Sequence, residues 1–236
     1  MTAVMDGVRV LEVAEHTFVP AASALLADYG AEIIKIEHVE RGDAMRGLAS
    51  SGLAVLGGAV HVLLEHSNRG KRSLGLDLTQ PDGLDLLYRL AATADVFITN
   101  NPRAESLQAL GLDFESLHAR NERLVVCNIS GFGMTGPYAG KPGYDMVAQA
   151  MSGTMSLTGP AHSDEPYRFP TAMADISTGV YAIIGILGAI LARQRTGQGE
   201  FIDVALLDSQ ITWLSYTAGS YFATNERPVR RGNTHP

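Results

Sequence analysis

Short apolar runs alternate with segments of helical spacing along the first half of the chain. Runs rich in β-branched residues predict strands at 8–13, 33–36, 96–99 and 124–129. Between them, apolar residues three or four apart, with a proline near the start, predict helices at about 20–30 and 79–90, and two short helices flank Gly111. Strand, helix and strand in this order predict an α/β fold with a largely parallel sheet.

The second half has a different pattern. Glycine and proline between 130 and 143 predict an irregular segment, followed by a helix at 145–152 and a loop to 174. We expect a long apolar helix at 176–193, a buried strand at 201–206 and a last helix that carries Trp213. The chain then divides into a large domain, 1–200, and a segment, 201–236, with a strand, a helix and the start of a linker.

Composition excludes several classes of protein. The 236 residues include 46% hydrophobic residues, too many for a disordered chain. The net charge of −7 argues against nucleic-acid binding, because neutralising phosphates needs a basic face. A single cysteine, Cys127, excludes a disulfide framework and favours a core role in a reducing compartment.

Targeting and membrane segments are also not expected. The N-terminus has neither the basic nor the apolar region of a signal peptide. The most apolar stretch, 180–192, is shorter than the roughly 20 residues that span a bilayer, so a buried core helix is the better interpretation. We therefore expect a soluble, cytoplasmic protein that does not bind membranes.

One glycine-rich segment and one basic segment are candidates for anion binding. Residues 131–136 match G-x-G-x-x-G after a predicted strand, but the prolines and glycines that follow prevent the helix that a dinucleotide site requires. Residues 69–72, Arg-Gly-Lys-Arg, form the densest basic cluster of an acidic chain. This cluster is either a solvated turn or a site where arginine and lysine bind a phosphate.

Asp175 stands out at the start of the long apolar helix. Aspartate is a common N-cap, and the positive end of the helix dipole favours its ionised form. A desolvated carboxylate can also attack activated carbonyls, and the small residues of 177–179 leave room for a substrate. From the residues alone, both roles stay open. His61 and His66 are five apart, a spacing that does not suit a metal site, and we expect none.

Together these pieces resemble a known family over essentially the whole chain. The segments that carry the resemblance are 7–12, 29–37, 68–74, 94–100, 131–133 with 136–138, 142–145, 174–179 and 196–199. Each is weak alone, but their number and order identify the chain as similar to the class III CoA-transferases, with formyl-CoA transferase, carnitine CoA-transferase and the related α-methylacyl-CoA racemases.

The resemblance implies a fold and a reaction. The fold would be a Rossmann-like large domain that binds CoA, with a small C-terminal domain that this chain lacks. Asp175 matches the family's nucleophile, which attacks an acyl-CoA, passes through an aspartyl anhydride and an aspartyl-CoA thioester, and delivers CoA to a free carboxylic acid. No tightly bound cofactor is implied, since coenzyme A and acyl-CoA are substrates.

Tyr144 separates the transferases from the racemases of this family. The racemases carry a histidine at that position as an acid/base group, whereas the transferases carry tyrosine, as here. A phenol with an ordinary pKa near 10 is a poor base for an α-proton. An acyl-CoA racemase or epimerase therefore stays the alternative rather than the first expectation.

The resemblance also implies residues that bind CoA. Lys71 and Arg72 would contact the phosphates of its nucleotide, and the loops after two strands would line the site through His16 and Thr17, and through Asn101 and Arg103. Gly143 belongs to the motif beside Tyr144, and Leu206 falls near the thiol end. The aromatic and Pro-Gly residues that usually follow the asparagine are absent, so this loop departs from the family pattern.

The end of the chain resembles a motif that lies mid-chain in the family. Residues 231–236 read Arg-Gly-Asn-Thr-His-Pro, which the family follows with a small domain and a glycine-rich active-site loop. We therefore expect an N-terminal fragment, and a CoA-binding fragment without activity is a further alternative. Family members form interlocked homodimers, so the complete protein is expected to do so too.

Overall fold

The computed structural model describes residues 3–48 and 60–234. The strands are β1 (Arg9–Val13), β2 (Glu32–Glu37), β3 (Lys71–Gly75), β4 (Val96–Thr99), β5 (Val125–Ser130) and β6 (Phe201–Ala205). The helices are α1 (Phe18–Asp28), the 3₁₀ helix η1 (Ala44–Gly47), α2 (Val62–Asn68), α3 (Pro81–Ala91), α4 (Ala104–Ala109), α5 (Phe114–His118), α6 (Asp145–Met151), α7 (Thr154–Leu157), α8 (Met173–Thr196), α9 (Leu206–Thr212) and α10 (Ser215–Thr224).

The strands of the described residues form one parallel sheet. Its order is β3-β2-β1-β4-β5-β6, and every neighbouring pair is parallel. This is the strand order of the Rossmann fold, so the predicted fold class is confirmed. The order reverses between β1 and β4, where the loops after these strands diverge and leave a crevice at the carboxyl edge of the sheet.

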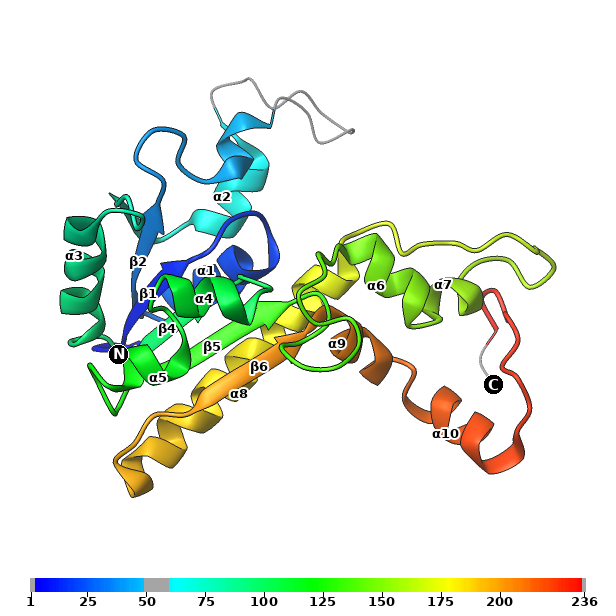
Figure 1. Cartoon of the computed structure of the whole chain (residues 1–236). Coiled ribbons are helices and arrows are strands. Elements are labelled where there is room, and N and C mark those ends of the chain that lie inside the picture. The colour runs from blue at the N-terminus through cyan, green and yellow to red at the C-terminus, as the bar shows by residue number, and fades with distance from the viewer. Residues whose placement is uncertain (1–2, 49–59, 235–236) are drawn as a thin grey trace.

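Helices cover both faces of the sheet (Figure 1). Successive side chains of a strand point to opposite faces, so Val10 joins the apolar core beneath α1 and α8, and Leu11 joins the core beneath α3, α4 and α5. The same alternation holds in β4, where Ile98 and Phe97 lie on opposite faces. Burial on both faces explains why these strands appear in the sequence as continuous apolar runs.

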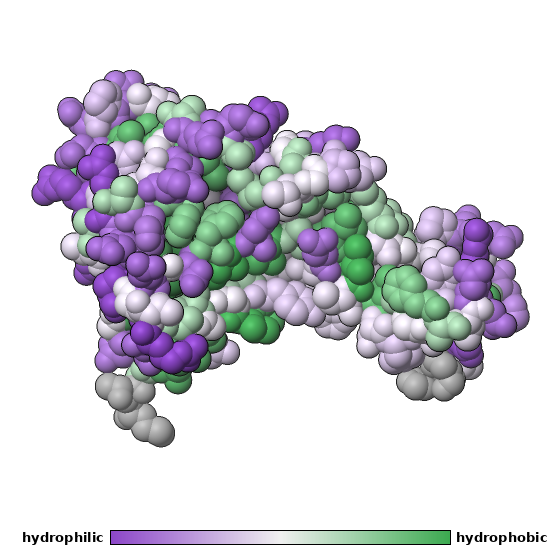
Figure 2. Space-filling view, turned by 60° about the horizontal axis from the view of Figure 1, so that its bottom comes forward, coloured by the Kyte–Doolittle hydropathy of each residue, from purple (hydrophilic) through white to green (hydrophobic). Residues whose placement is uncertain are grey.

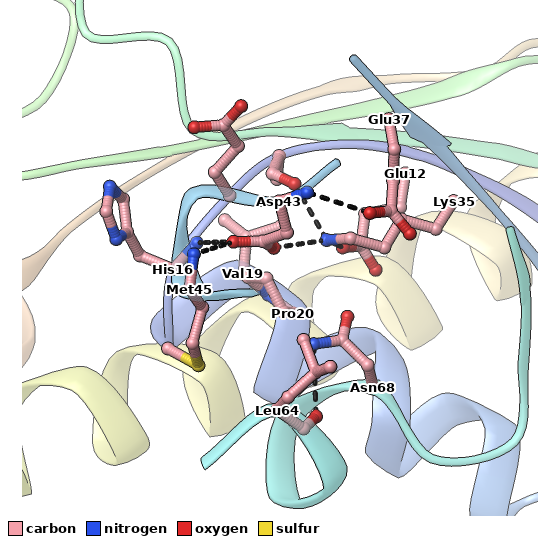
Figure 3. Close-up of polar contacts among 12 residues, drawn as sticks. Glu12, His16, Val19, Pro20, Lys35, Glu37, Asp43, Met45, Leu64 and Asn68 are labelled. Carbon is pink, nitrogen blue, oxygen red and sulfur yellow. Dashed lines mark hydrogen bonds and ion pairs between the residues drawn. The ribbon is translucent and has the colours of Figure 1, made fainter. Parts of the chain in front are cut away.

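Charged side chains interrupt the core on the α1 face of the sheet. Glu12 of β1 and Lys35 of β2 are 0% and 1% exposed, and they are paired in the strand register. Lys35 Nζ lies 2.5 Å from Glu12 Oε1 and 2.8 Å from Asp43 Oδ2 (Figure 3). Buried charges are tolerated only when they are paired in this way.

Helix α8 is long and apolar enough to cross a membrane by length and composition alone. It instead packs against α1, α9, β5 and β6, and Ala182, Ile186 and Ala189 on its inner side are buried in the core. Arg193 near its end donates to Asp95 Oδ1 at 2.8 Å and ties the helix to the start of β4. The expected core helix is therefore confirmed.

Several elements differ from the sequence prediction. Helices α2 and α7 were not expected, and the basic segment 69–72 partly forms strand β3 rather than a turn. The last helix is two helices, because Trp213 ends α9. Strand β6 was expected to be buried, but it lies at an edge of the sheet and Phe201 is 40% exposed.

Helices α6, α7 and α10 extend away from the sheet (Figure 1). The segment after α10 returns to α7 and the loop that follows it, where Arg230 donates hydrogen bonds to the carbonyls of Ser156 and Ser163. The last two residues of the motif at 231–236 lie outside the described residues. In Figure 2, apolar side chains are exposed over the middle of the molecule, whereas polar side chains dominate its left-hand end.

Candidate active site

A cavity of about 290 Å³ opens at the carboxyl edge of the sheet, beside the start of α8. It is lined by the residues that follow β1, β4 and β5 and by the starts of α6 and α8. The lining residues are His16, Thr17, Phe18, Asn100, Pro102, Ser130, Gly131, Pro142, Gly143, Tyr144, Asp145 and Asp175. Residues far apart in the sequence meet here because parallel strands all end at the same edge.

Two carboxylates share this cavity. Asp175 is the third residue of α8, and the N-cap is Ala172, so Asp175 is not the cap. Asp145, the first residue of α6, takes that part instead: its Oδ1 accepts from the Ala174 N–H at 2.7 Å and lies 3.4 Å from the Asp175 nitrogen. The side chain of Asp175 is thereby left to face the cavity.

The pKa of Asp175 is raised to about 7, first by burial and then by the nearby charge of Asp145. The helix dipole favours the ionised form of Asp175, but burial and the charge of Asp145 act in the opposite direction. Desolvation and like charge outweigh the dipole here. The Asp175 carboxyl therefore lies in surroundings that solvate its ionised form poorly.

A close backbone contact holds the irregular segment after β5 against the sheet. A Cβ added to Gly143 would lie 2.3 Å from the Gly131 Cα, and one added to Gly131 would lie 2.5 Å from the Gly143 Cα. Only glycine at both positions permits this approach, which brings Tyr144 and Asp145 to the cavity. No helix or strand forms from 131 to 143, as the glycines and prolines predicted.

Gln149 connects Asp145 to the loop that precedes α8. Its side chain is buried, and its Nε2 donates to Asp145 Oδ2 at 2.7 Å. Its Oε1 accepts from the Phe169 N–H at 2.7 Å. The loop from 158 to 172 is thus fixed to the same carboxylate that caps α8.

A second, larger cavity of about 630 Å³ continues along the same edge of the sheet. It shares His16, Asn100 and Pro102 with the first cavity, so the two form one groove. Its other lining residues are Val13, Ala14, Glu15, Ile36, Glu37, His38, Arg41, Leu76, Asp77, Leu78, Thr79, Thr99, Asn101, Leu107, Leu110 and Leu112. Among the described lining residues, Arg41 is the only lysine or arginine, and it forms an ion pair with Glu15 at 3.0 Å.

The structure brings most of the predicted site residues together. His16, Thr17, Gly143, Tyr144 and Asp175 line the first cavity, and Asn101 lines the second.

Two further residues of the prediction, Arg103 and Leu206, line neither cavity. Arg103 is the exposed N-cap of α4, and Leu206 is fully buried at the start of α9. Leu206 therefore supports the core beneath the groove in this structure.

Lys71 and Arg72 lie away from the groove. The Lys71 Nζ is buried and donates to Glu12 Oε2, the Pro20 carbonyl and Asn68 Oδ1, so its donors are already satisfied within the protein. Burial lowers its pKa to about 8. Arg72 is exposed at the amino-terminal half of β3 and pairs with Glu32 at 2.6 Å. In this conformation neither cation reaches the carboxyl edge where the cavities open.

Several lining residues were missed by the sequence analysis. Asn100 and Ser130 lie where β4 and β5 end, and Arg41 follows β2. Their position after predicted strands could have identified them, because side chains that follow parallel strands converge on one edge of the sheet. The role of Asp145 had no such signal, since its contact with α8 joins residues 29 apart in sequence.

Metal and thiol chemistry find no support in the described part of the chain. No group of three or more His, Cys, Asp or Glu side chains there could hold a metal ion. Cys127 is fully buried in β5, and burial raises the pKa of its thiol, so it packs as a core residue.

The fold and groove define a Rossmann-type α/β protein with a groove at the carboxyl ends of its strands, next to a carboxylate of raised pKa. The chain matches the model of CoA-transferase family III over residues 5–236. It belongs to this family.

Relatives and solved structures agree with this assignment. The chain is 42% identical over 234 residues to a succinate–glutarate CoA-transferase of Agrobacterium fabrum, covering 98% of this chain and 58% of the relative. It is 36% identical over 231 residues to the human succinyl-CoA:glutarate CoA-transferase, and the match covers 98% of this chain and 51% of the relative. A CAIB/BAIF family protein from Brucella suis has a TM-score of 0.91 at 41% identity, covering 100% of this chain and 62% of that one. The chain spans about half the length of its curated relatives.

Proposed function

We propose that the protein containing this chain is a CoA-transferase that moves CoA from an acyl-CoA to a free carboxylic acid, with Asp175 as the nucleophile. The observation that carries the proposal is the position of Asp175: a carboxylate with a pKa of about 7 lines a cavity that continues into a larger groove. The names of the relatives support a dicarboxylic acyl group, such as succinyl or glutaryl.

The reaction begins with an exchange at the donor. An ionised Asp175 oxygen attacks the thioester carbonyl carbon, the C–S bond breaks, and CoA leaves as a thiolate. The product is a mixed anhydride of Asp175 and the donor acid. The thiolate then attacks the Asp175 carboxyl carbon, the donor leaves as a carboxylate, and Asp175 is left as a CoA thioester.

The second half reverses these steps with the acceptor. The acceptor carboxylate attacks the Asp175 carboxyl carbon and expels the thiolate, which then attacks the acceptor's acyl carbon. Asp175 leaves as a carboxylate, and the complete reaction consumes neither a proton nor ATP. The groove's contribution is to hold the thiolate near Asp175 while the acids exchange, because two bound reactants react as a unimolecular system.

We assign the two cavities to two parts of the substrate. The first, beside Asp175, would hold the acyl group and the thioester. The second would hold the nucleotide end of CoA, where Arg41 and His38 are the basic groups and the leucines after β3 and in the α4 region provide an apolar wall. This assignment moves the phosphate contacts from Lys71 and Arg72 to the other end of the strands.

We also propose that the complete protein is a homodimer. The outer side of α8 and the end of α10 expose large apolar side chains, among them Ile184 at 60%, Leu191 at 59% and Phe222 at 82%. Exposed apolar surface of this extent is typical of protein–protein contacts. The resemblance to interlocked dimers names a second copy of the chain as the partner.

A transfer assay tests the proposed function. The complete natural protein is incubated with succinyl-, glutaryl- or acetyl-CoA and a free carboxylic acid in deuterated water, and the CoA esters are separated by mass. We expect CoA to appear on the acceptor without ATP, and the activity to be lost in Asp175→Ala but kept in Asp85→Asn, an exposed carboxylate on α3. Deuterium at the α-carbon without transfer would instead identify a racemase, and CoA binding with neither reaction would identify an inert binding protein.

A further inference from the structure

His16 has an unusual backbone conformation at the centre of the groove. Its φ is +70°, in the left-handed region that side chains other than glycine rarely adopt. It is also one of the residues that line both cavities. A residue stays in such a strained backbone conformation only when contacts with the surrounding structure hold it there.

One buried carboxylate holds the His16 backbone. The His16 N–H donates to Asp43 Oδ1 at 3.1 Å, and the same oxygen accepts from the Met45 N–H at 2.9 Å (Figure 3). Asp43 is 1% exposed. Asp43 therefore connects the turn after β1 to η1, although it lies 27 residues after His16 in the chain.

A balanced set of buried charges fixes Asp43 in turn. Its Oδ2 lies 2.8 Å from Lys35 Nζ, which also donates to the Ala14 carbonyl at 2.8 Å and to Glu12 Oε1. Glu12 Oε2 accepts from Lys71 Nζ at 2.6 Å. Two carboxylates thus face two ammonium groups, and the cluster is neutral. Lys35 holds the turn at residue 14 while Asp43 holds it at residue 16.

We propose that Asp43 is a positioning residue of the acyl-CoA groove: through the His16 N–H it holds the 14–17 turn in the conformation that places His16 between the two cavities. The proposal rests on the proposed function for the identity of the ligand. Asp43 lines neither cavity, so it acts through His16 and not by touching the substrate.

A pair of double variants isolates the hydrogen bond from the charge. Asp43→Asn with Lys35→Met and Asp43→Ala with Lys35→Met each remove one negative and one positive charge, so the cluster stays neutral in both. Asparagine keeps an oxygen that can accept from the His16 N–H, and alanine does not. Both are made in the complete natural protein.

The two variants should differ in CoA binding and in the mobility of the turn. Both variants lose the contact of Lys35 with the Ala14 carbonyl, so the comparison is between the two. By titration calorimetry with CoA, we expect the Ala variant to bind about tenfold more weakly than the Asn variant, as for one lost buried hydrogen bond. KM for acyl-CoA should rise by a similar factor with kcat little changed, because the lost contact acts on bound substrate and transition state alike. Deuterium exchange of the His16 amide should be faster in the Ala variant only.

The proposal would be overturned if the two variants had the same CoA affinity and the same exchange rate of the His16 amide. If both bound CoA more weakly than the parent by the same factor, the effect would belong to the lost charges and not to the hydrogen bond. If the Ala variant does not fold, Asp43→Ser with Lys35→Met replaces it, since serine can cap η1 but is shorter than asparagine, and the same differences are expected. If the parent neither binds CoA nor transfers it, the proposed function fails, while the exchange comparison still decides whether Asp43 holds the turn.

Discussion

At the scale of single residues, the environment of each carboxylate decides its role. Asp175 and Asp145 lie at the starts of two helices and line one cavity, yet Asp145 accepts backbone N–H groups, whereas burial raises the pKa of Asp175. Hydrogen bonds from N–H groups stabilise a carboxylate anion, whereas burial without them destabilises it. The same residue type thus becomes a cap in one place and a candidate nucleophile in the other.

The first residue-scale prediction concerns the pH profile of transfer. Because attack needs the ionised form of Asp175, kcat/KM should rise with pH through about 7. Asp145→Asn keeps an oxygen that can cap α8 but removes the charge that raises the pKa of Asp175, so the midpoint should move to lower pH. Asp85→Asn is the control, and a midpoint that does not move in Asp145→Asn would show that Asp145 does not tune Asp175.

The second residue-scale prediction concerns stability. The pKa of Asp175 is higher in the folded protein, about 7 against an ordinary 3.8, so its favourable contribution is present below pH 4 and is lost as pH rises through 7. Asp175→Asn cannot ionise. After allowance for solvent screening of a partly exposed group, it should raise the free energy of unfolding by about 1–2 kcal/mol at pH 8 relative to the parent, and by much less at pH 4.5.

Urea unfolding of the parent and of Asp175→Asn at the two pH values measures this difference. Active-site groups commonly cost stability, so a gain on removal is the expected sign. An equal effect at both pH values would mean that the ionisation of Asp175 is not coupled to folding.

At the scale of elements, the sequence predicts the interior of the fold better than its edges. Strand β4 is found at the predicted residues, and β1, β2, β5, α3 and α6 differ by one or two residues at their ends, because each carries a clear apolar period. Strand β3 was missed because it is largely exposed and contains Lys71 and Arg72. Nothing local to this segment indicates that Lys71 is buried against Glu12, which lies 59 residues earlier in the chain.

The candidate site follows the same rule. The family resemblance predicted the loops after β1 and β4, and Asp175 at the start of α8 was a candidate from its position in the chain as well. The Asp145 cap, the Gln149 link and the His16–Asp43 contact were not, because each depends on packing between elements distant in sequence.

The element-scale prediction tests the contact between the segment after β5 and the start of α6. Gly143→Ala places a methyl group 2.3 Å from the Gly131 Cα, so backbone must move, and we expect a loss of about 1–3 kcal/mol in the free energy of unfolding. Transfer activity should fall with it, because Tyr144 and Asp145 are displaced. Gly47→Ala, where an added Cβ meets nothing within 4 Å, is the matched control and should change stability by less than about 0.5 kcal/mol. Equal stability of the two variants would contradict the assigned contact.

At the scale of the whole molecule, the described residues form one parallel sheet and one continuous groove. The strand order places the crevice between β1 and β4, and His16, at the end of β1, lies where the two cavities meet. The outer side of α8 and the end of α10 leave apolar residues exposed. This exposed apolar surface is the basis of the proposed homodimer.

The whole-molecule prediction is the oligomeric state. Light scattering on the complete natural protein should give twice the mass of one chain. Ile184→Glu, which puts a charge on the exposed side of α8, should shift the protein toward the monomer, whereas Asp85→Asn should not. A monomeric parent at micromolar concentration would contradict the proposed dimer.

The central claim is that Asp175 carries CoA covalently during transfer. The most direct measurement is mass spectrometry of acid-quenched peptides after the complete protein has been incubated with an acyl-CoA donor and no acceptor. We predict CoA in thioester linkage on the peptide that contains Asp175, its loss when an acceptor carboxylate is added, and its absence in Asp175→Ala. Full transfer activity in Asp175→Ala, or transfer with CoA attached to a different residue, would show that Asp175 is not the nucleophile.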